Sequence, residues 1–96
     1  MPQYPGGNAE LLRYVAHHIR YPALALRNGI EGRVYVKFVV DETGRVIDLN
    51  VVKGIGGGCD EEAVRVLRTL SRFEPGRQNG RAVKVYFNVP IAFMIK

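Results

Sequence analysis

The sequence predicts a small α+β domain, in which a three-stranded antiparallel sheet packs against helices in the order α-α-β-β-α-β. Three patterns indicate it: two alternating apolar segments joined by a turn signature at 41–44, an apolar stripe of helical spacing from 63 to 73, and a last alternating segment from 81. The 96 residues are 47% hydrophobic and 24% charged, which suits one domain with one modest core.

Two helices are expected before the first strand. Asn8 is the expected N-cap of the first helix, which runs to about Arg20. Pro22 disfavours a helical conformation in the residue before it, and its fixed φ suits the first position of a short second helix. Gly29 supplies the left-handed residue that ends this second helix. One face of the first helix carries its apolar side chains, which are Leu11, Leu12, Val15 and Ile19.

A β-hairpin is expected next. Residues 33–40 alternate between apolar and polar side chains, and the turn at 41–44 contains Gly44, which adopts a positive φ without strain. Residues 45–53 return, with Asp48 and Asn50 on their outer side, so one face of the sheet is expected to contact water. The residues expected on the core face are Val34, Val36, Phe38 and Val40 in the first strand and Ile47, Leu49 and Val51 in the second.

A glycine-rich link at 54–59 leads into the third helix and lacks the spacing of a phosphate-binding loop. Asp60 is the expected cap of this helix, with Glu61 and Glu62 in the first turn, where the helix dipole favours acidic side chains. Residues 74–76 are expected to end it. Its buried stripe is expected to consist of Ala63, Val66, Leu67, Leu70 and Phe73.

The last strand is expected from 81 to about 93, after a turn at Asn79 and Gly80. Pro90 cannot donate to a ladder, so this strand belongs at an edge of the sheet. An unpaired edge can accept an extended peptide as an additional strand, or it can be protected from pairing by Pro90 and Lys84. Core-facing positions are Val83, Val85, Phe87 and Val89, and outward-facing positions are Lys84, Tyr86 and Asn88.

The net charge is +5, from 14 lysines and arginines against 9 acidic residues. The basic residues are dispersed along the chain, which favours a solvated surface over a polyanion site. A small RNA-binding module that uses Tyr35 and Tyr86 is the alternative of a different class, but these tyrosines lie outside any RNA-recognition signature. We therefore expect no nucleic acid as a partner.

No constellation of residues in the sequence indicates catalysis. His17 and His18 are adjacent in a predicted helix and point about 100° apart, so they cannot share a metal ion. Cys59 is the only cysteine and lies outside any catalytic signature, so we expect it to be a small buried or capping residue. The sequence therefore predicts no enzyme, no cofactor and no metal site.

The order of several short motifs resembles the C-terminal domain of the TonB family. Each motif alone has low specificity, but the ordered combination is specific, and it covers the chain from about 21 to the end. The lead-in PGG at 5–7 and the first helix resemble the version found in Bacteroidetes-type bacteria. Residues 1–20 are therefore expected to be a lead-in with the first helix, and residues 21–96 the TonB C-terminal-like domain. The motifs are YPALA at 21–25, GIEGRV at 29–34, FVVDETGRV at 38–46, DEEA at 60–63, RFEPG at 72–76, GRAV at 80–83 and PIAF at 90–93.

The resemblance implies a periplasmic, non-catalytic domain of an energy transducer. In this family an N-terminal helix anchors the protein in the inner membrane beside a proton-driven motor complex. The C-terminal domain binds the TonB box of outer-membrane transporters as an added strand, for nutrient uptake. The sequence contains no signal peptide and no apolar run of the roughly 20 residues that a membrane span requires, so we expect one domain of a longer, anchored protein. The tail of a membrane sensor or peptidase is the alternative parent.

The peptide site is expected along the last strand and at the start of the matched region. Arg20 can pair with an acidic residue of the peptide, but an exposed pair contributes only about 0.2–1 kcal/mol, so the backbone ladder must dominate. We expect a monomer with a tendency to dimerise by strand exchange. The candidate site residues are Arg20, Tyr21, Ala82, Val83, Lys84, Val85, Tyr86, Phe87, Asn88 and Val89.

Overall fold

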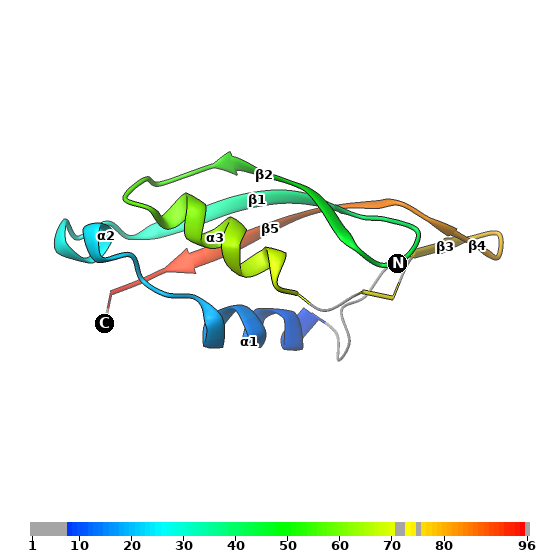
Figure 1. Ribbon diagram of the computed structural model, residues 1–96, viewed down its shortest axis with the longest axis horizontal. Helices are drawn as coiled ribbons and strands as arrows, with labels where there is room; N and C mark the ends of the chain where they lie inside the picture. The colour runs from blue at the N-terminus through cyan, green and yellow to red at the C-terminus, as the bar shows by residue number, and fades with distance from the viewer. Residues whose placement is uncertain (1–7, 71–72, 75, 96) are drawn as a thin grey trace.

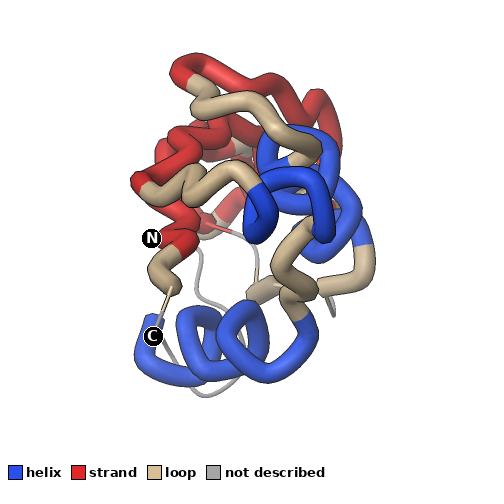
Figure 2. Tube along the Cα trace, turned by 90° about the vertical axis from the view of Figure 1, so that its left-hand side faces the viewer, coloured by secondary structure: helices blue, strands red, loops and turns tan. Residues whose placement is uncertain are grey.

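The computed structural model describes residues 8–70, 73–74 and 76–95. Figure 1 shows α3 lying over one face of a sheet and α1 running below β5, and Figure 2 shows the strands and the helices as separate layers. This is the predicted α+β class. Its elements are α1 (Asn8–His18), α2 (Ala23–Arg27), β1 (Gly32–Val40), β2 (Val46–Lys53), α3 (Cys59–Arg68), β3 (Gly76–Gln78), β4 (Arg81–Val83) and β5 (Val85–Phe93).

The main sheet is antiparallel and has the strand order β2-β1-β5. β1 and β5 pair without interruption, from Gly32 opposite Phe93 to Val40 opposite Val85. This unbroken register puts the apolar residues of both strands on one face, because side chains directly opposite each other point to the same side of a sheet. β1 is therefore the central strand, and β2 and β5 are the two outer strands.

The core lies between this face of the sheet and the helices. Phe38 is at its centre, with its ring centroid 5.3 Å from that of Phe87 and 6.1 Å from that of Phe73. α1 belongs to the same core, because its Leu11 and Val15 are only 5% and 7% exposed. The other buried members are Ala25, Val34, Val36, Val40, Cys59, Ala63, Val66, Leu67, Ile91 and Phe93.

β2 corrects one expectation about the core. Val46 and Leu49 pack against the core, whereas Ile47 pairs with Val39 on the opposite face. The cause is a bulge, because the register shifts between Lys37 and Val39 while Asp48 adopts a φ of +53°. The extra residue reverses the alternation on one side of it, which strict alternation along the sequence cannot reveal.

The helix ends also differ from those expected. α1 ends at His18 rather than Arg20, and Pro22 precedes α2 in an extended conformation instead of opening it. α3 begins at Cys59, with Gly58 at the N-cap position in the left-handed region. Asp60 therefore does not cap α3; its Oδ1 accepts hydrogen bonds from the backbone N–H groups of the link, from Ile55 at 2.9 Å and Gly56 at 3.3 Å.

α3 is also shorter than predicted, since it ends at Arg68 with Thr69 as its C-cap. Phe73 is buried as expected, but it follows the helix rather than extending it. The turn at 41–44 has the predicted form, with Gly44 at φ +86° and its carbonyl accepting a 2.8 Å bond from the Phe73 backbone. Arg72, Pro75 and the predicted lead-in before Asn8 lie outside the described residues.

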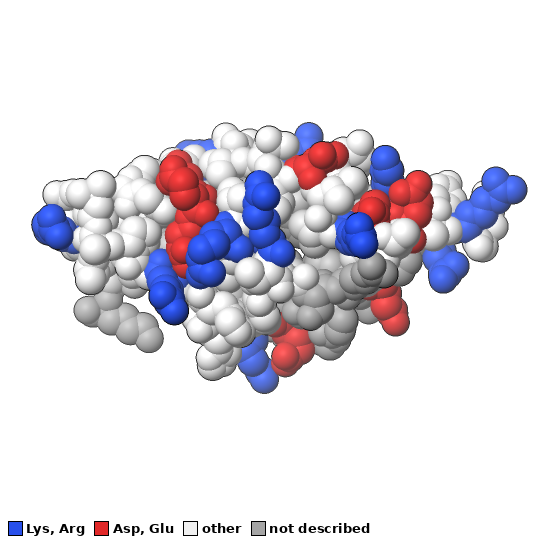
Figure 3. All heavy atoms as spheres, in the orientation of Figure 1, with Lys and Arg blue, Asp and Glu red and all other residues white. Residues whose placement is uncertain are grey.

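The predicted last strand is divided in two. β4 pairs with β3 in a separate hairpin, and Lys84 separates it from β5. Asn79 and Gly80 have the positive φ values, +54° and +78°, of a two-residue hairpin turn. The hairpin projects from one end and extends the molecule to 50 × 23 × 16 Å (Figure 1). Basic side chains gather at that end of the surface in Figure 3.

Candidate functional site

The free edge of β5 is the part of the sheet that can accept another strand. Pro90 lies in the ladder opposite Tyr35 although it has no N–H, so its nitrogen must point away from β1. Backbone groups alternate between the two sides of a strand. Phe87 and Val89 therefore bond to β1, whereas Tyr86 and Asn88 direct their N–H and C=O groups to the free edge. No other strand of the described chain pairs with this edge.

α1 lies alongside this edge without covering its whole length. A groove of about 230 Å³ lies between Leu11 and Leu12 of α1 and residues 87–90 of β5. A second hollow, of about 350 Å³, lies further along the edge, between Ala16 and residues 92–94. β5 therefore has β1 on one side and α1 near its free side (Figure 1), and the α1 residues that border the two hollows are apolar.

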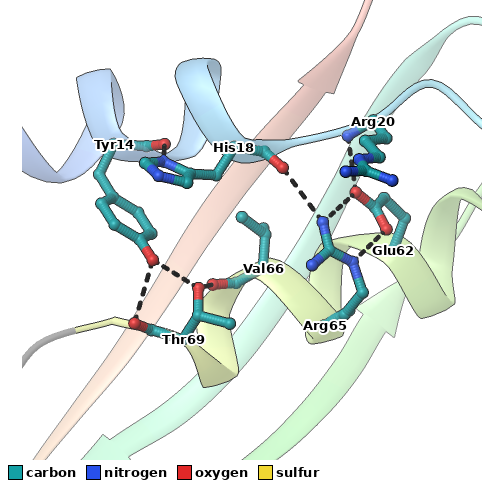
Figure 4. Close-up of polar contacts among 7 residues, drawn as sticks. All are labelled: Tyr14, His18, Arg20, Glu62, Arg65, Val66 and Thr69. Atoms are coloured by element: carbon teal, nitrogen blue, oxygen red, sulfur yellow. Dashed lines mark hydrogen bonds and ion pairs between the residues drawn. The ribbon is translucent and has the colours of Figure 1, made fainter.

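A group of hydrogen bonds fastens the end of α1 to α3, as Figure 4 shows. Arg65 donates from Nη2 to the His18 carbonyl at 3.1 Å, and from Nε and Nη2 to the Glu62 carboxylate at 2.6 and 2.8 Å. The backbone N–H of Arg20 also donates to the Glu62 carboxylate, to Oε2 at 2.6 Å. The Arg65 guanidinium beside Glu62 holds the pKa of that carboxyl below its usual value. We call these four residues the α1–α3 clasp.

A second contact supports the middle of α1. The Tyr14 hydroxyl lies 3.1 Å from the Thr69 carbonyl, to which it donates, and 2.7 Å from Thr69 Oγ1. The Tyr14 ring stacks on His18, with the centroids 4.0 Å apart. These contacts and the clasp all lie on the α3 side of the helix, so the side that faces β5 is left to its apolar side chains.

The predicted site residues fall into three groups. Those at 85–89 lie in β5, where Tyr86 and Asn88 supply the free edge. Ala82 and Val83 lie in β4, and Lys84 lies between the strands, so these three do not belong to the continuous edge. Lys84 is exposed, and Val83 pairs with Gly76 rather than joining the core.

Arg20 and Tyr21 occupy the segment between α1 and α2. Tyr21 borders the second hollow, its hydroxyl donates to the Ile30 carbonyl, and its ring meets Phe93 edge-on at 5.6 Å. Burial raises the pKa of its hydroxyl. Arg20 contributes its backbone to the clasp and its side chain is exposed. Tyr21 thus has a structural role at the end of the groove.

Sequence reasoning missed the contribution of α1 to the site. Leu12 and Ala16 border the two hollows, and Leu12 remains 55% exposed although it belongs to the apolar stripe. The sequence shows only that Leu12 is apolar, and whether such a residue is buried or exposed depends on where α1 packs. Ala92 and Met94, beyond the predicted range, also line the edge.

Other candidate chemistry is limited among the described residues. They contain no group of three or more histidine, cysteine or acidic side chains placed to hold a metal ion. Cys59 is fully buried, and burial raises the pKa of its thiol, so the reactive thiolate is disfavoured. Within the same residues, no helix has both the length and the apolar character needed to cross a membrane.

Comparison with known proteins gives a consistent result over nearly the whole chain. The family model described as the Gram-negative bacterial TonB protein C-terminal matches residues 17–95. A TonB2 protein of Pseudomonas aeruginosa is 34% identical over 92 residues, which are 95% of this chain and 33% of that protein. A TonB protein of Helicobacter pylori is 30% identical over 97 residues, covering 96% of this chain and again 33% of the relative.

The fold matches a solved structure as well. A solution structure of the Helicobacter pylori TonB C-terminal domain superimposes with a TM-score of 0.68 and 26% sequence identity, over 88% of this chain and 89% of that one. The chain spans about a third of the length of these two curated relatives.

Proposed function

The chain belongs to the family of Gram-negative bacterial TonB C-terminal domains, and from this membership we propose that it is the periplasmic, peptide-binding domain of an energy transducer. In this proposal the free edge of β5 accepts the TonB box of an outer-membrane transporter as an additional strand. The rest of the transducer, with its membrane anchor and its contact to a proton-driven motor, transmits energy to the transporter. The domain itself carries out no catalysis.

One observation supports this proposal above the others. β5 offers a regular edge of nine residues, Val85–Phe93, whose pairing with β1 is uninterrupted. The N–H groups of Tyr86, Asn88 and Ala92 point to the open side, together with the carbonyls of these residues and of Pro90. An extended peptide satisfies such groups through its own backbone, with little demand on its side chains. Pro90 removes one donor from this row, so the strongest ladder is expected around Tyr86 and Asn88.

The experiment is peptide binding to a proline variant. Asn88→Pro removes an N–H from the free edge but leaves the bonds between β5 and β1 in place, and Asn88→Ala is the control that keeps the N–H. We expect Asn88→Pro to weaken binding of a TonB-box peptide by about tenfold or more in calorimetry, since a hydrogen bond is lost and a ring enters the peptide's space. Asn88→Ala should bind like the parent chain.

Circular dichroism and thermal melts show whether both variants keep the fold. Equal affinities of a folded Asn88→Pro and the parent chain would exclude strand addition at this edge. Failure of the parent chain to bind TonB-box peptides from any transporter of the same genome would exclude the transducer role itself.

A further inference from the structure

The groove beside β5 has a second wall that backbone pairing alone does not require. α1 supplies that wall, through Leu11 and Leu12 opposite residues 87–90 and Ala16 opposite residues 92–94. Leu12 is 55% exposed, so part of its apolar surface remains in water in the unbound chain. A ligand that covers this side chain gains the free energy of burying it.

α1 is held from its other side. Tyr14 bonds to Thr69 and Arg65 bonds to the His18 carbonyl, and both partners belong to α3 or its cap. Leu11 and Val15 are buried in the core at the same time. The helix is therefore fixed relative to β5, and hollows of about 230 and 350 Å³ remain between it and the edge.

We propose that α1 and β5 together form a slot for a single extended peptide whose side chains are apolar at every second position. This inference rests on the proposed function, because it assumes that the peptide pairs with β5. A strand added to a sheet lies about 4.8 Å from its neighbour, and its side chains alternate between the two faces. Those pointing to the same side as Phe87 and Val89 meet Leu11, Leu12 and Ala16, and those between them meet water.

The α1 wall also disfavours pairing between β5 and the β5 edge of a second folded copy. A second copy that paired β5 with β5 around a twofold axis would bring its own α1 to the same side of the joined sheet. The two helices would then lie on the same side of the seam and compete for the space beside it. The slot thus accepts an unfolded peptide segment and excludes self-association through β5.

Leu12→Ser tests the wall, and Leu24→Ser is its matched control, because Leu24 in α2 is also 55% exposed but lines neither hollow. The probe is a TonB-box peptide from a transporter of the same genome, measured by calorimetry. We expect Leu12→Ser to weaken binding about fivefold, as for loss of roughly half of a leucine's burial. Leu24→Ser should leave the affinity unchanged.

Serine substitutions along the peptide complete the test as a double-mutant cycle. Coupling with Leu12 should appear at peptide positions of one parity only, and amide exchange in α1 should slow when the peptide binds.

Equal affinities of Leu12→Ser and Leu24→Ser would overturn the slot. Tighter binding by Leu12→Ser, with faster exchange in α1, would also overturn it and make α1 a cover that must leave. A loss of binding in Asn88→Pro with no effect of Leu12→Ser would retain strand addition and reject the wall alone.

Discussion

The two outer strands of the sheet present very different edges. β5 pairs with β1 in one unbroken register over Val85–Phe93, and α1 borders its free side. β2 pairs with the other side of β1 but shifts register twice, and Asp48 within it adopts a φ of +53°. The side chains of β2 are also more exposed towards its end, where Val52 is 58% exposed.

This difference shows how a small sheet can keep one edge for pairing and protect the other. Bulges bend an edge and disturb the spacing of its N–H and C=O groups, so another strand cannot form a long ladder with it. A regular edge needs a different protection, and at β5 the neighbouring helix supplies it. In the proposed function the two edges therefore differ in selectivity, because the bulges of β2 disfavour pairing with any strand whereas β5 accepts a single extended peptide.

The largest expected effect tests the assignment of backbone groups in β5. Phe87→Pro removes a bond to β1 and a ring from the aromatic cluster, so it should lower the free energy of unfolding by about 3–5 kcal/mol in urea titrations. Asn88→Pro, one residue away, should cost about 1 kcal/mol or less, because its N–H faces the open side. Equal losses of stability at the two positions would show that the alternation of bonds is assigned wrongly.

A smaller effect is expected at the β2 edge. Asp48→Val adds a residue of high strand propensity but forces a β-branched side chain into a positive φ, so it should destabilise the fold by about 1–2 kcal/mol. Lys53→Val is the matched variant at an exposed position of β2 that pairs with Tyr35, away from Asp48, and it should be neutral or slightly stabilising. Urea unfolding of both proteins measures the difference. A stabilising Asp48→Val would mean that the bulge does not exist in solution.

The smallest effect concerns the α1–α3 clasp, which holds α1 in place beside the β5 edge. The pKa of Glu62 is lowered, chiefly by its hydrogen bond with Arg65, from an ordinary value of 4.5. Its contribution to stability is therefore complete above that ordinary value and is lost as the pH falls through the lower folded pKa. Urea midpoints of the parent chain and Glu62→Gln should differ near neutral pH and converge in acid. A constant difference at all pH values would contradict this role of Glu62.

Much of the fold could be predicted from the sequence because its signals are local. The alternation in β1, the turn at Gly44 and the apolar stripe of α3 from Ala63 to Leu67 each occupy one short segment, and all were predicted correctly. The bulge at Asp48 was not, because it depends on how two strands align rather than on either strand alone. The division of the last strand at Lys84 was also missed, since its alternation continues through the break.

The candidate site could be predicted only in part for the same reason. Pro90 indicated that the last strand is an edge, and the residues at 85–89 do lie on it. The partnership of Leu12 with that edge could not be predicted, because about 75 positions separate them in the sequence and only the packing of α1 on α3 brings them together. The motifs of the domain begin at about 21, so apart from Arg20 at its expected end the first helix carried no functional expectation.

Cys59 is the single thiol of the chain, so the rate at which it is alkylated reports how often the fold opens. It is fully buried at the start of α3, and burial raises the pKa of its thiol, so an alkylating reagent reacts only after α3 separates from the sheet. At high reagent concentration the labelling rate then equals the opening rate. In an oxidising compartment the same opening would expose the sulfur to a second molecule, and the lifetime of the closed state would limit how fast covalent dimers accumulate.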